Sequence, residues 1–389
     1  MRIVGAGALG TGLARALSSR GRRVELYTRG WQSPDGTPQR DGRRCEIRGR
    51  AWNPAVAPGR AWPSGVAVRS LSTLAAGRSA FGPSASGTSA SHMFASDTSA
   101  SDPSASDPSE SNTSASNQVP IVLCLSSAER ATIAAAIAGG ATEVPRSAVA
   151  RASVEALERD LPWSALAGAP VLVVTNPVEL ACELVARRTG NPDVLGFGMA
   201  TDRERIAEAL MRGFGETAPP DLELTGLHAR RAIPLFSAEL AARLAESNPD
   251  AVRARLAATP GPYDALGRAA ELFDRLLPKH MTQATRAHEL VHTVVRAITV
   301  AEFDGPRPPV ARPVAVLARQ VDGWLTGAAD APAEVSGAVV RHGARVFLGG
   351  RVTSAGFASR EPGALEADLL ESELAAHLEQ VRDLLGEPP

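Results

Sequence analysis

The chain of 389 residues contains few cysteines and few aromatic residues. Its three cysteines are an odd number without paired spacing, which argues against a disulfide framework and favours the reducing environment of the cytoplasm. Cys124 and Cys182 lie in apolar runs, so we expect both to be small residues of the core.

Strong charge and long apolar runs are also missing. The formal net charge is −1, so no overall field attracts nucleic acid or an anionic membrane. No run of about 18 apolar residues could span a membrane, and the first residues lack the pattern of a signal peptide. We therefore expect neither nucleic acid nor a membrane as a partner, and we assign no metal ligands. The length suits two domains with a sizeable core.

A glycine-rich turn follows an expected short strand at residues 2–4 and precedes an apolar helical run. Its spacing is G-x-G-x-x-G, and a place between a strand and a helix is the context in which this motif binds a dinucleotide. Gly5 permits the tight turn, Gly7 lets the backbone approach a pyrophosphate at the helix N-terminus, and Gly10 lets the helix pack on the strand. The alternative is a turn without a ligand. The residues assigned to the dinucleotide are Gly5, Gly7, Ala8, Leu9 and Gly10. Few residues precede Gly5, so either this strand is short or translation starts upstream.

The second expected strand, residues 24–29, ends in Thr28 and Arg29. A fold that prefers NAD usually ends this strand in an acidic residue that binds the ribose hydroxyls, and Glu25 lies too early to serve. Arg29 can instead pair with a 2′-phosphate. We therefore expect NADP(H) as the cofactor, with NAD as the alternative if Arg29 is simply solvated.

Four further strands are expected at residues 66–71, 120–125, 171–176 and 194–196. They would complete a parallel sheet in a Rossmann dinucleotide-binding domain at residues 1–198. Ligands of such sheets bind beyond the carboxyl ends of the strands, where Ser126 and Asn176 lie. Residues 79–117 are rich in Ser, Ala, Asp and Pro and nearly devoid of large apolar groups, so we expect a disordered insertion there.

Residues 199–389 are expected to form a mixed substrate domain, which gives an α/β fold overall. Extended segments are expected at residues 229–237, 315–320 and 345–348. Helices are expected at residues 265–277, 283–303 and 367–385, besides one at 147–161 in the first half. The last helix carries an apolar stripe with charges opposite, as a packed surface helix does.

Three side chains of the second half supply the groups needed to reduce a keto acid. Asp202 and Arg205 are three residues apart, so on a helix they share one face. An imidazole such as that of His228 passes a proton to a carbonyl oxygen, and a carboxylate holds it in the correct tautomer. A guanidinium grips a substrate carboxylate through two parallel hydrogen bonds. These residues therefore predict an oxidoreductase site.

The motifs and their order resemble the lactate/malate dehydrogenase family over nearly the whole chain. The segments that carry the resemblance are residues 5–10, 173–179, 196–205, 226–228, 233–237, 297–303, 312–316 and 346–350. The resemblance implies a Rossmann domain followed by an α/β substrate domain, and a homodimer or homotetramer. It also implies that His228 exchanges the proton, that Asp202 is its partner and that Arg205 binds the substrate carboxylate.

Further roles follow from the same resemblance. Asn176 would contact substrate or nicotinamide, and His292 or Thr293 falls near a position that touches substrate. The family also uses a mobile-loop arginine that polarises the carbonyl. Arg146 lies about where that arginine should be, and Arg130 is the rival because this loop is longer than usual.

The chain departs from the family after His228: the family commonly continues with Gly and then Asp, whereas this chain continues with Ala229, Arg230 and Arg231. Extra arginines near the site would favour a second anionic group on the substrate, but they can equally face solvent or another subunit. Two functions stay open. The first is reduction of a 2-oxo acid by NAD(P)H, which includes a specialised biosynthetic keto acid reductase. The second is a non-catalytic NADP-binding or scaffold protein that kept the fold and uses its insertion for partners.

Overall fold

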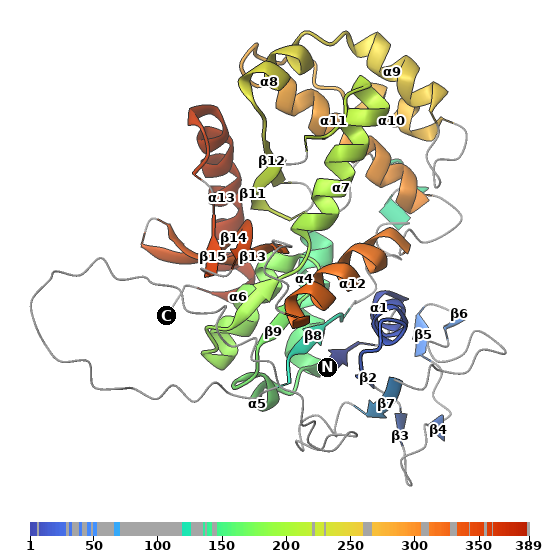
Figure 1. Cartoon of the computed structure of the whole chain (residues 1–389), viewed down its shortest axis with the longest axis vertical. Helices are drawn as coiled ribbons and strands as arrows, with labels where there is room; N and C mark the ends of the chain where they lie inside the picture. The colour runs from blue at the N-terminus through green and yellow to red at the C-terminus, as the bar shows by residue number, and fades with distance from the viewer. Residues whose placement is uncertain are drawn as a thin grey trace, which may run out of the picture.

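The structure of the chain is a computed structural model with a central sheet, helices on both of its faces and a second helical body beside it (Figure 1). It describes residues 1–5, 8–28, 31–32, 39–40, 45–47, 50–52, 66–70, 119–125, 135–136, 138–141, 146–219, 222–228, 231–259, 267–304, 311–326, 333–341, 343–353, 356–359 and 361–386. The expected insertion at residues 79–117 lies outside these ranges.

In the described part of the chain, one sheet has nine strands. Six of them are parallel and, numbered along the chain, lie in the spatial order 3-2-1-4-5-6. This order is typical of dinucleotide-binding folds. The expected α/β fold class with a parallel Rossmann sheet is therefore confirmed. The six strands are β1 (Arg2–Val4), β2 (Val24–Thr28), β7 (Val66–Ser70), β8 (Ile121–Leu123), β9 (Val171–Val173) and β10 (Val194–Gly196).

Three antiparallel strands from the second half extend this sheet at its β10 edge. They are β13 (Ala333–Arg341), β14 (Ala344–Thr353) and β15 (Gly356–Ala358). Gly196 in β10 pairs with Ser336 in β13. The sheet thus combines strands from both halves, and the division at residue 198 stays a proposal about domains. The remaining strands form three separate hairpins: β3 (Trp31–Gln32) with β4 (Gln39–Arg40), β5 (Cys45–Ile47) with β6 (Arg50–Trp52), and β11 (Glu223–Leu227) with β12 (Arg231–Leu235).

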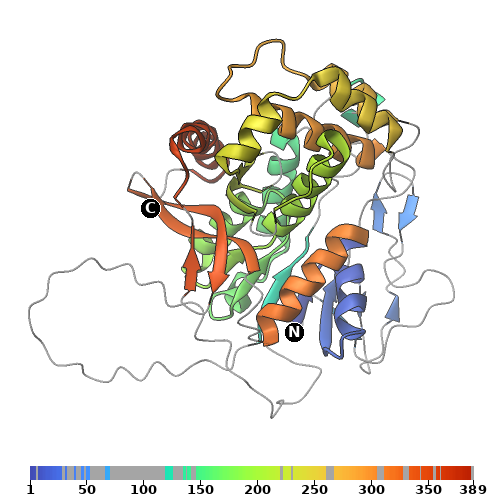
Figure 2. The same cartoon turned by 45° about the horizontal axis from the view of Figure 1, so that its top comes forward.

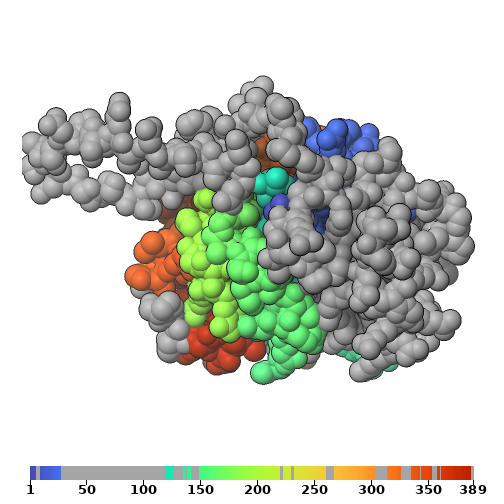
Figure 3. All heavy atoms as spheres, turned by 90° about the horizontal axis from the view of Figure 1, so that it is seen from below, coloured from blue at the N-terminus to red at the C-terminus, as the bar shows by residue number. Residues whose placement is uncertain are grey.

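The parallel strands are short and apolar because both faces of the sheet are covered. Successive residues point to opposite faces, so Ile3 packs with one cluster and Val4 with the other. The Val4 face is covered by α4 (Arg146–Asp160), α5 (Trp163–Leu166) and α6 (Val178–Thr189). Figure 3 shows this layer in green beside the red C-terminal helix, α13 (Ala364–Leu385). Cys124 and Cys182 are buried as expected, and burial raises the pKa of the Cys124 thiol to about 12.

The Ile3 face is covered by α1 (Ala8–Ser18) and α12 (Ala311–Thr326), which lie side by side (Figure 2). The expectation of an extended segment at residues 315–320 is wrong, because these residues lie inside α12. Leu317, Val321 and Trp324 recur at helical spacing and are buried against the sheet face. A Cβ on Gly12 would lie 2.7 Å from Val314 Cγ2, so the glycine permits the close approach of α1 and α12.

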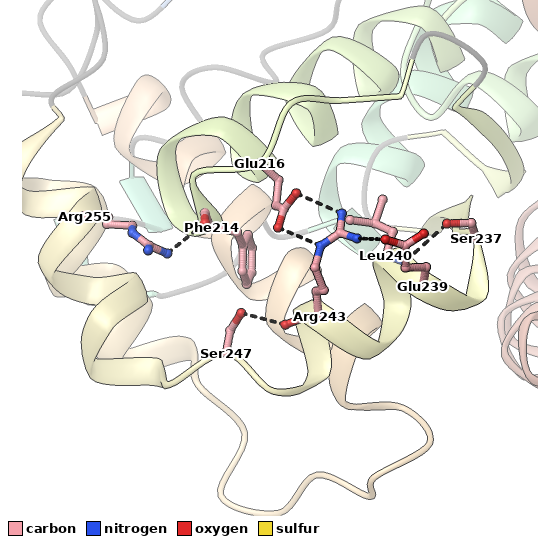
Figure 4. Close-up of polar contacts among 8 residues, drawn as sticks. All are labelled: Phe214, Glu216, Ser237, Glu239, Leu240, Arg243, Ser247 and Arg255. Carbon is pink, nitrogen blue, oxygen red and sulfur yellow. Dashed lines mark hydrogen bonds and ion pairs between the residues drawn. The ribbon is translucent and has the colours of Figure 1, made fainter.

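The second body contains α7 (Met199–Ala209), which continues as a π-helix, η2 (Leu210–Phe214), together with α8 (Ala238–Ala245), α9 (Pro249–Ala258), α10 (Arg268–Leu276) and α11 (Arg286–Asp304). The helices expected in this half and at residues 147–161 are all present, with ends shifted by a few residues. Arg243 of α8 forms ion pairs with Glu216, which follows η2, and with Glu239 of its own helix (Figure 4). Arg255 of α9 donates a hydrogen bond to the carbonyl of Phe214 in η2. No helix in the described residues is long and apolar enough to cross a membrane.

Candidate active site

The glycine-rich turn has the close packing that a dinucleotide-binding turn requires. Gly5 follows β1 with φ +109°, and a Cβ there would lie 2.5 Å from the carbonyl oxygen of Cys124. A Cβ on Gly10 would overlap the carbonyl oxygen of Gly5. Neither position tolerates a side chain, so the first turn of α1 sits directly against the strand ends. Such a cradle fits a pyrophosphate at the helix N-terminus.

Several residues assigned to the cofactor cannot be placed in this site. Gly7, Arg29 and Ser126 lie outside the described residues. Ala8 begins α1 and Thr28 ends β2, although only their backbone is described. Leu9 packs against the cluster on the Ile3 face. Glu25 is buried and accepts hydrogen bonds from Arg2 Nε (3.3 Å) and the Tyr27 hydroxyl (3.1 Å), in accord with its expected absence from the ribose site.

A histidine–carboxylate pair lies where α7 meets the end of β11. Asp202 is in the first turn of α7, and His228 directly follows β11. The Nδ1 atom of His228 lies 2.7 Å from Oδ2 of Asp202, which is only 2 % exposed. Because a carboxylate accepts, the proton of the neutral imidazole lies on Nδ1 and leaves Nε2 with a lone pair. The pair therefore has the geometry of a general acid–base histidine with its orienting carboxylate.

Arg205 lies one helical turn after Asp202 on the same face of α7. Its Nη1 atom is 3.6 Å from Oδ1 of Asp202, and its side chain is 11 % exposed. The Nε atom is buried and has no hydrogen-bond partner among the described residues. A guanidinium with an unused N–H beside a histidine can donate hydrogen bonds to a planar anion such as a carboxylate. The structure thus brings His228, Asp202 and Arg205 together as the sequence predicts.

Gly198, which sequence reasoning did not single out, forms one wall of this site. A Cβ on Gly198 would overlap the imidazole of His228, with Nδ1 at 2.5 Å. The ring therefore lies flat against the backbone at the start of α7. The signal in the sequence is the pair of glycines, Gly196 and Gly198, between β10 and α7.

Glu179 was also missed as a site residue. It lies in the first turn of α6 and is 3 % exposed. Its Oε1 atom accepts hydrogen bonds from the backbone N–H of His228 (2.8 Å) and from the hydroxyl of Ser336 (2.6 Å). Its partners lie 49 and 157 residues away, so no local spacing reveals this contact.

His292 and Thr293, the two residues considered for substrate contact, both lie in α11. Burial lowers the pKa of the His292 imidazole to about 4, helped by nearby His288 and Arg296 and opposed by Asp202. His292 is therefore a neutral group at neutral pH, close enough to Asp202 to sense its charge. The hydroxyl of Thr293 instead donates to the carbonyl of Glu289 on its own helix (2.7 Å).

The remaining site candidates are placed only in part. Asn176 is partly buried between β9 and α6, at the carboxyl edge of the sheet as expected. Arg146 is the first residue of α4, but its side chain lies outside the described part, as do Arg130 and Arg230 and the side chain of Arg231. No cluster of His, Cys, Asp and Glu in the described residues could hold a metal ion.

Comparisons with known proteins give the same fold. No protein-family model and no curated protein sequence matches the chain. Solved structures match it over nearly its whole length. The malate dehydrogenase of Picrophilus torridus in its apo form matches with a TM-score of 0.54 at 13% identity, over 98% of this chain and 96% of that chain.

Two lactate dehydrogenases also match over nearly the full length. That of Cryptosporidium parvum, complexed with lactic acid and nicotinamide adenine dinucleotide, has a TM-score of 0.50 at 13% identity over 100% of this chain and 98% of that chain. That of Eimeria maxima, with NADH and oxamate, has a TM-score of 0.50 at 13% identity over 99% of this chain and 93% of that chain. The chain therefore has a divergent fold of the lactate and malate dehydrogenase type.

Proposed function

We propose that this protein is an oxidoreductase that transfers a hydride between a nicotinamide dinucleotide and a 2-oxo or 2-hydroxy acid. The observation that carries the proposal is the contact of His228 Nδ1 with Asp202 at 2.7 Å, with Arg205 on the same face of α7. The glycine turn after β1 supports it, because its backbone cradle fits the dinucleotide. The fold shared with lactate and malate dehydrogenases agrees with this chemistry.

Each residue of the site has a distinct task in this reaction. Arg205 binds the substrate carboxylate through two parallel hydrogen bonds and so fixes the position of the carbonyl carbon. When bound, the nicotinamide supplies or accepts the hydride. In reduction, a protonated His228 delivers a proton from Nε2 to the carbonyl oxygen, and Asp202 stabilises the imidazolium before that transfer. We assign the polarising mobile-loop arginine to Arg146 and contacts with the bound molecules to Asn176 and His292.

The proposed cofactor is NADP(H), because Arg29, which follows Thr28 in the sequence, can pair with a 2′-phosphate. The two lactate dehydrogenase structures hold NAD or NADH, so NAD is the alternative. Arg230 and Arg231 support a substrate with a second anionic group. A cytoplasmic homodimer or homotetramer completes the proposal, as for the family that the chain resembles.

The test follows the loss of NADPH absorbance with a panel of 2-oxo acids, with NADH in parallel. The panel contains pyruvate, oxaloacetate, branched keto acids, phosphonopyruvate and sulfopyruvate. We expect turnover with at least one member, a preference for NADPH that Arg29→Ala reverses, and loss of turnover in His228→Ala. Tight NADPH binding with no turnover on any member would reject the enzyme and favour a non-catalytic NADP-binding protein.

A further inference from the structure

The carboxylate of Glu179 is buried and has no ion-pair partner among the described residues, which needs an explanation. Glu179 is 3 % exposed, and no cationic side chain in the described part of the chain forms an ion pair with it. Its neighbour one turn on, Glu183, is also buried but contacts Arg187 (2.6 Å) and Arg345 (3.8 Å). A buried charge without a counter-ion is retained only where hydrogen bonds and dipoles stabilise it. For Glu179 those donors belong to His228 and Ser336.

We propose that Glu179 and Ser336 are positioning residues that fix the main chain of His228 for proton transfer. This inference rests on the proposed function of His228. The N–H of His228 and the hydroxyl of Ser336 donate to the same oxygen, Oε1 of Glu179, at 2.8 and 2.6 Å. The three residues come from α6, from the end of β11 and from β13, so the contact joins segments that are remote in sequence.

Each member of this contact is itself held firmly. Glu179 lies in the first turn of α6, where free backbone N–H groups and the helix dipole favour a negative charge. Ser336 is 0 % exposed and pairs with Gly196 of β10, and a Cβ on Gly196 would lie 3.0 Å from its Cβ. Oε1 of Glu179 therefore has little freedom to move. The same holds for the backbone N–H of His228 that donates to it.

The contact completes the set of constraints on His228. Asp202 fixes the direction of the ring at Nδ1, and the backbone of Gly198 lies against its face. Glu179 fixes the N–H, and so the Cα from which the ring projects. A ring held at Nδ1 alone can still shift as a unit with its backbone, and a shift on the order of 1 Å can lower a rate by about 100-fold.

The experiment compares Glu179→Gln, Ser336→Ala and the double variant with wild type, and it uses Glu183→Gln as the matched control. The control also removes a buried carboxylate from α6, but one that does not touch His228. For the preferred 2-oxo acid, we expect Glu179→Gln and Ser336→Ala to lower kcat by roughly 10- to 100-fold. KM should change less than about threefold because Arg205, which binds the substrate, is untouched. The double variant should lose no more than the worse single variant, since both act through one contact.

A second readout does not depend on turnover. The backbone amide proton of His228, assigned by NMR, should move upfield in Glu179→Gln and stay in place in Glu183→Gln, because only the first change weakens its hydrogen bond. An unchanged amide signal in folded Glu179→Gln overturns the proposal, and so does a kcat loss that Glu183→Gln reproduces. If wild type turns over no substrate, the proposed function fails, and the amide signal alone decides whether Glu179 holds His228.

Discussion

The imidazole of His228 occupies the space in which a Cβ on Gly198 would lie, with Nδ1 only 2.5 Å from that position. This contact explains why a residue without a side chain directly precedes α7. It also means that the helix which supplies Asp202 and Arg205 is the surface on which the histidine rests. The site is therefore sensitive to the smallest substitution at this position.

Gly198→Ala should displace the imidazole from Asp202. We expect kcat to fall by about 100-fold and the free energy of unfolding to fall by about 1–3 kcal/mol, as overpacking of a close contact does. The control is Gly323→Ala in α12, where nothing lies within 4 Å of the added Cβ. That variant should keep full activity and gain about 0.5–1 kcal/mol in stability. Steady-state kinetics and urea denaturation measure both effects, and equal activity of the two variants would contradict the contact.

Asp202→Asn should keep the fold but lose the correct histidine tautomer. An amide can donate to Nδ1, which would place the imidazole proton on Nε2 in the neutral enzyme and remove the charge that stabilises the imidazolium. We expect kcat to fall by roughly 10²- to 10⁴-fold, the range seen for loss of acid–base catalysis. Wild-type kinetics in this variant, with an unchanged circular dichroism spectrum, would remove Asp202 from the mechanism.

Arg205→Lys should weaken binding of the substrate carboxylate although the positive charge remains. A lysine cannot form the two parallel hydrogen bonds of a guanidinium, so we expect kcat/KM for the 2-oxo acid to fall by roughly 10- to 100-fold. NADPH affinity should not change. Arg243→Ala is the control, because the exposed ion pairs of Arg243 are with Glu216 and Glu239 and not with residues of the candidate site (Figure 4). It should leave kcat/KM intact, because an exposed ion pair of this kind contributes little to stability.

Two buried groups should affect stability with opposite dependence on pH. Burial raises the pKa of Glu334 to about 7 despite Arg203 and Arg351 nearby, with Glu223 acting in the same direction as burial. The folded protein then binds more protons than the unfolded chain between about pH 4.5 and 7, so this group stabilises the protein as pH falls. The lowered pKa of His292, about 4, has the reverse effect between about pH 4 and 6.5, where acid destabilises the fold.

Chemical denaturation across this pH range separates the two groups. Glu334→Gln removes the group that opposes His292, so the free energy of unfolding should fall more steeply on acidification than in wild type. In His292→Asn the profile should change in the opposite direction. The difference between wild type and either variant should be on the order of 1–3 kcal/mol across the window. Parallel profiles for all three proteins would contradict both assignments.

The sheet and most helices could be predicted because their signals are local. Buried parallel strands are continuous apolar runs, and the helices show apolar residues at a period near 3.6. The prediction of an extended segment at residues 315–320 was wrong because Val314 and Val316 favour extended structure in isolation. Their helix is decided by burial of Leu317 and Val321 against the sheet beside α1, which is information that no local window contains.

The candidate site could be predicted in part for a similar reason. Asp202 and Arg205 are neighbours in sequence, and the resemblance to a family supplied His228. The roles of Gly198 and Glu179 depend on contacts with the ring and the backbone of His228 across 30 and 49 residues. Residue type alone makes Glu179 an ordinary acidic residue in a first helical turn. Only the three-dimensional arrangement shows which groups donate to it.

The extension of the parallel sheet by β13 has a practical consequence for dissecting the protein. A fragment ending at residue 198 would leave the hydrogen-bonding groups of β10 unpaired where β13 now covers them. It would also uncover the side of α1 against which α12 packs, where Gly12 lies beside Val314, and it would remove the ion pair between Arg22 and Asp322. A bare strand edge and an uncovered apolar layer are a template for aggregation. The N-terminal half expressed alone should therefore be insoluble, whereas co-expression of the two halves should recover a soluble complex.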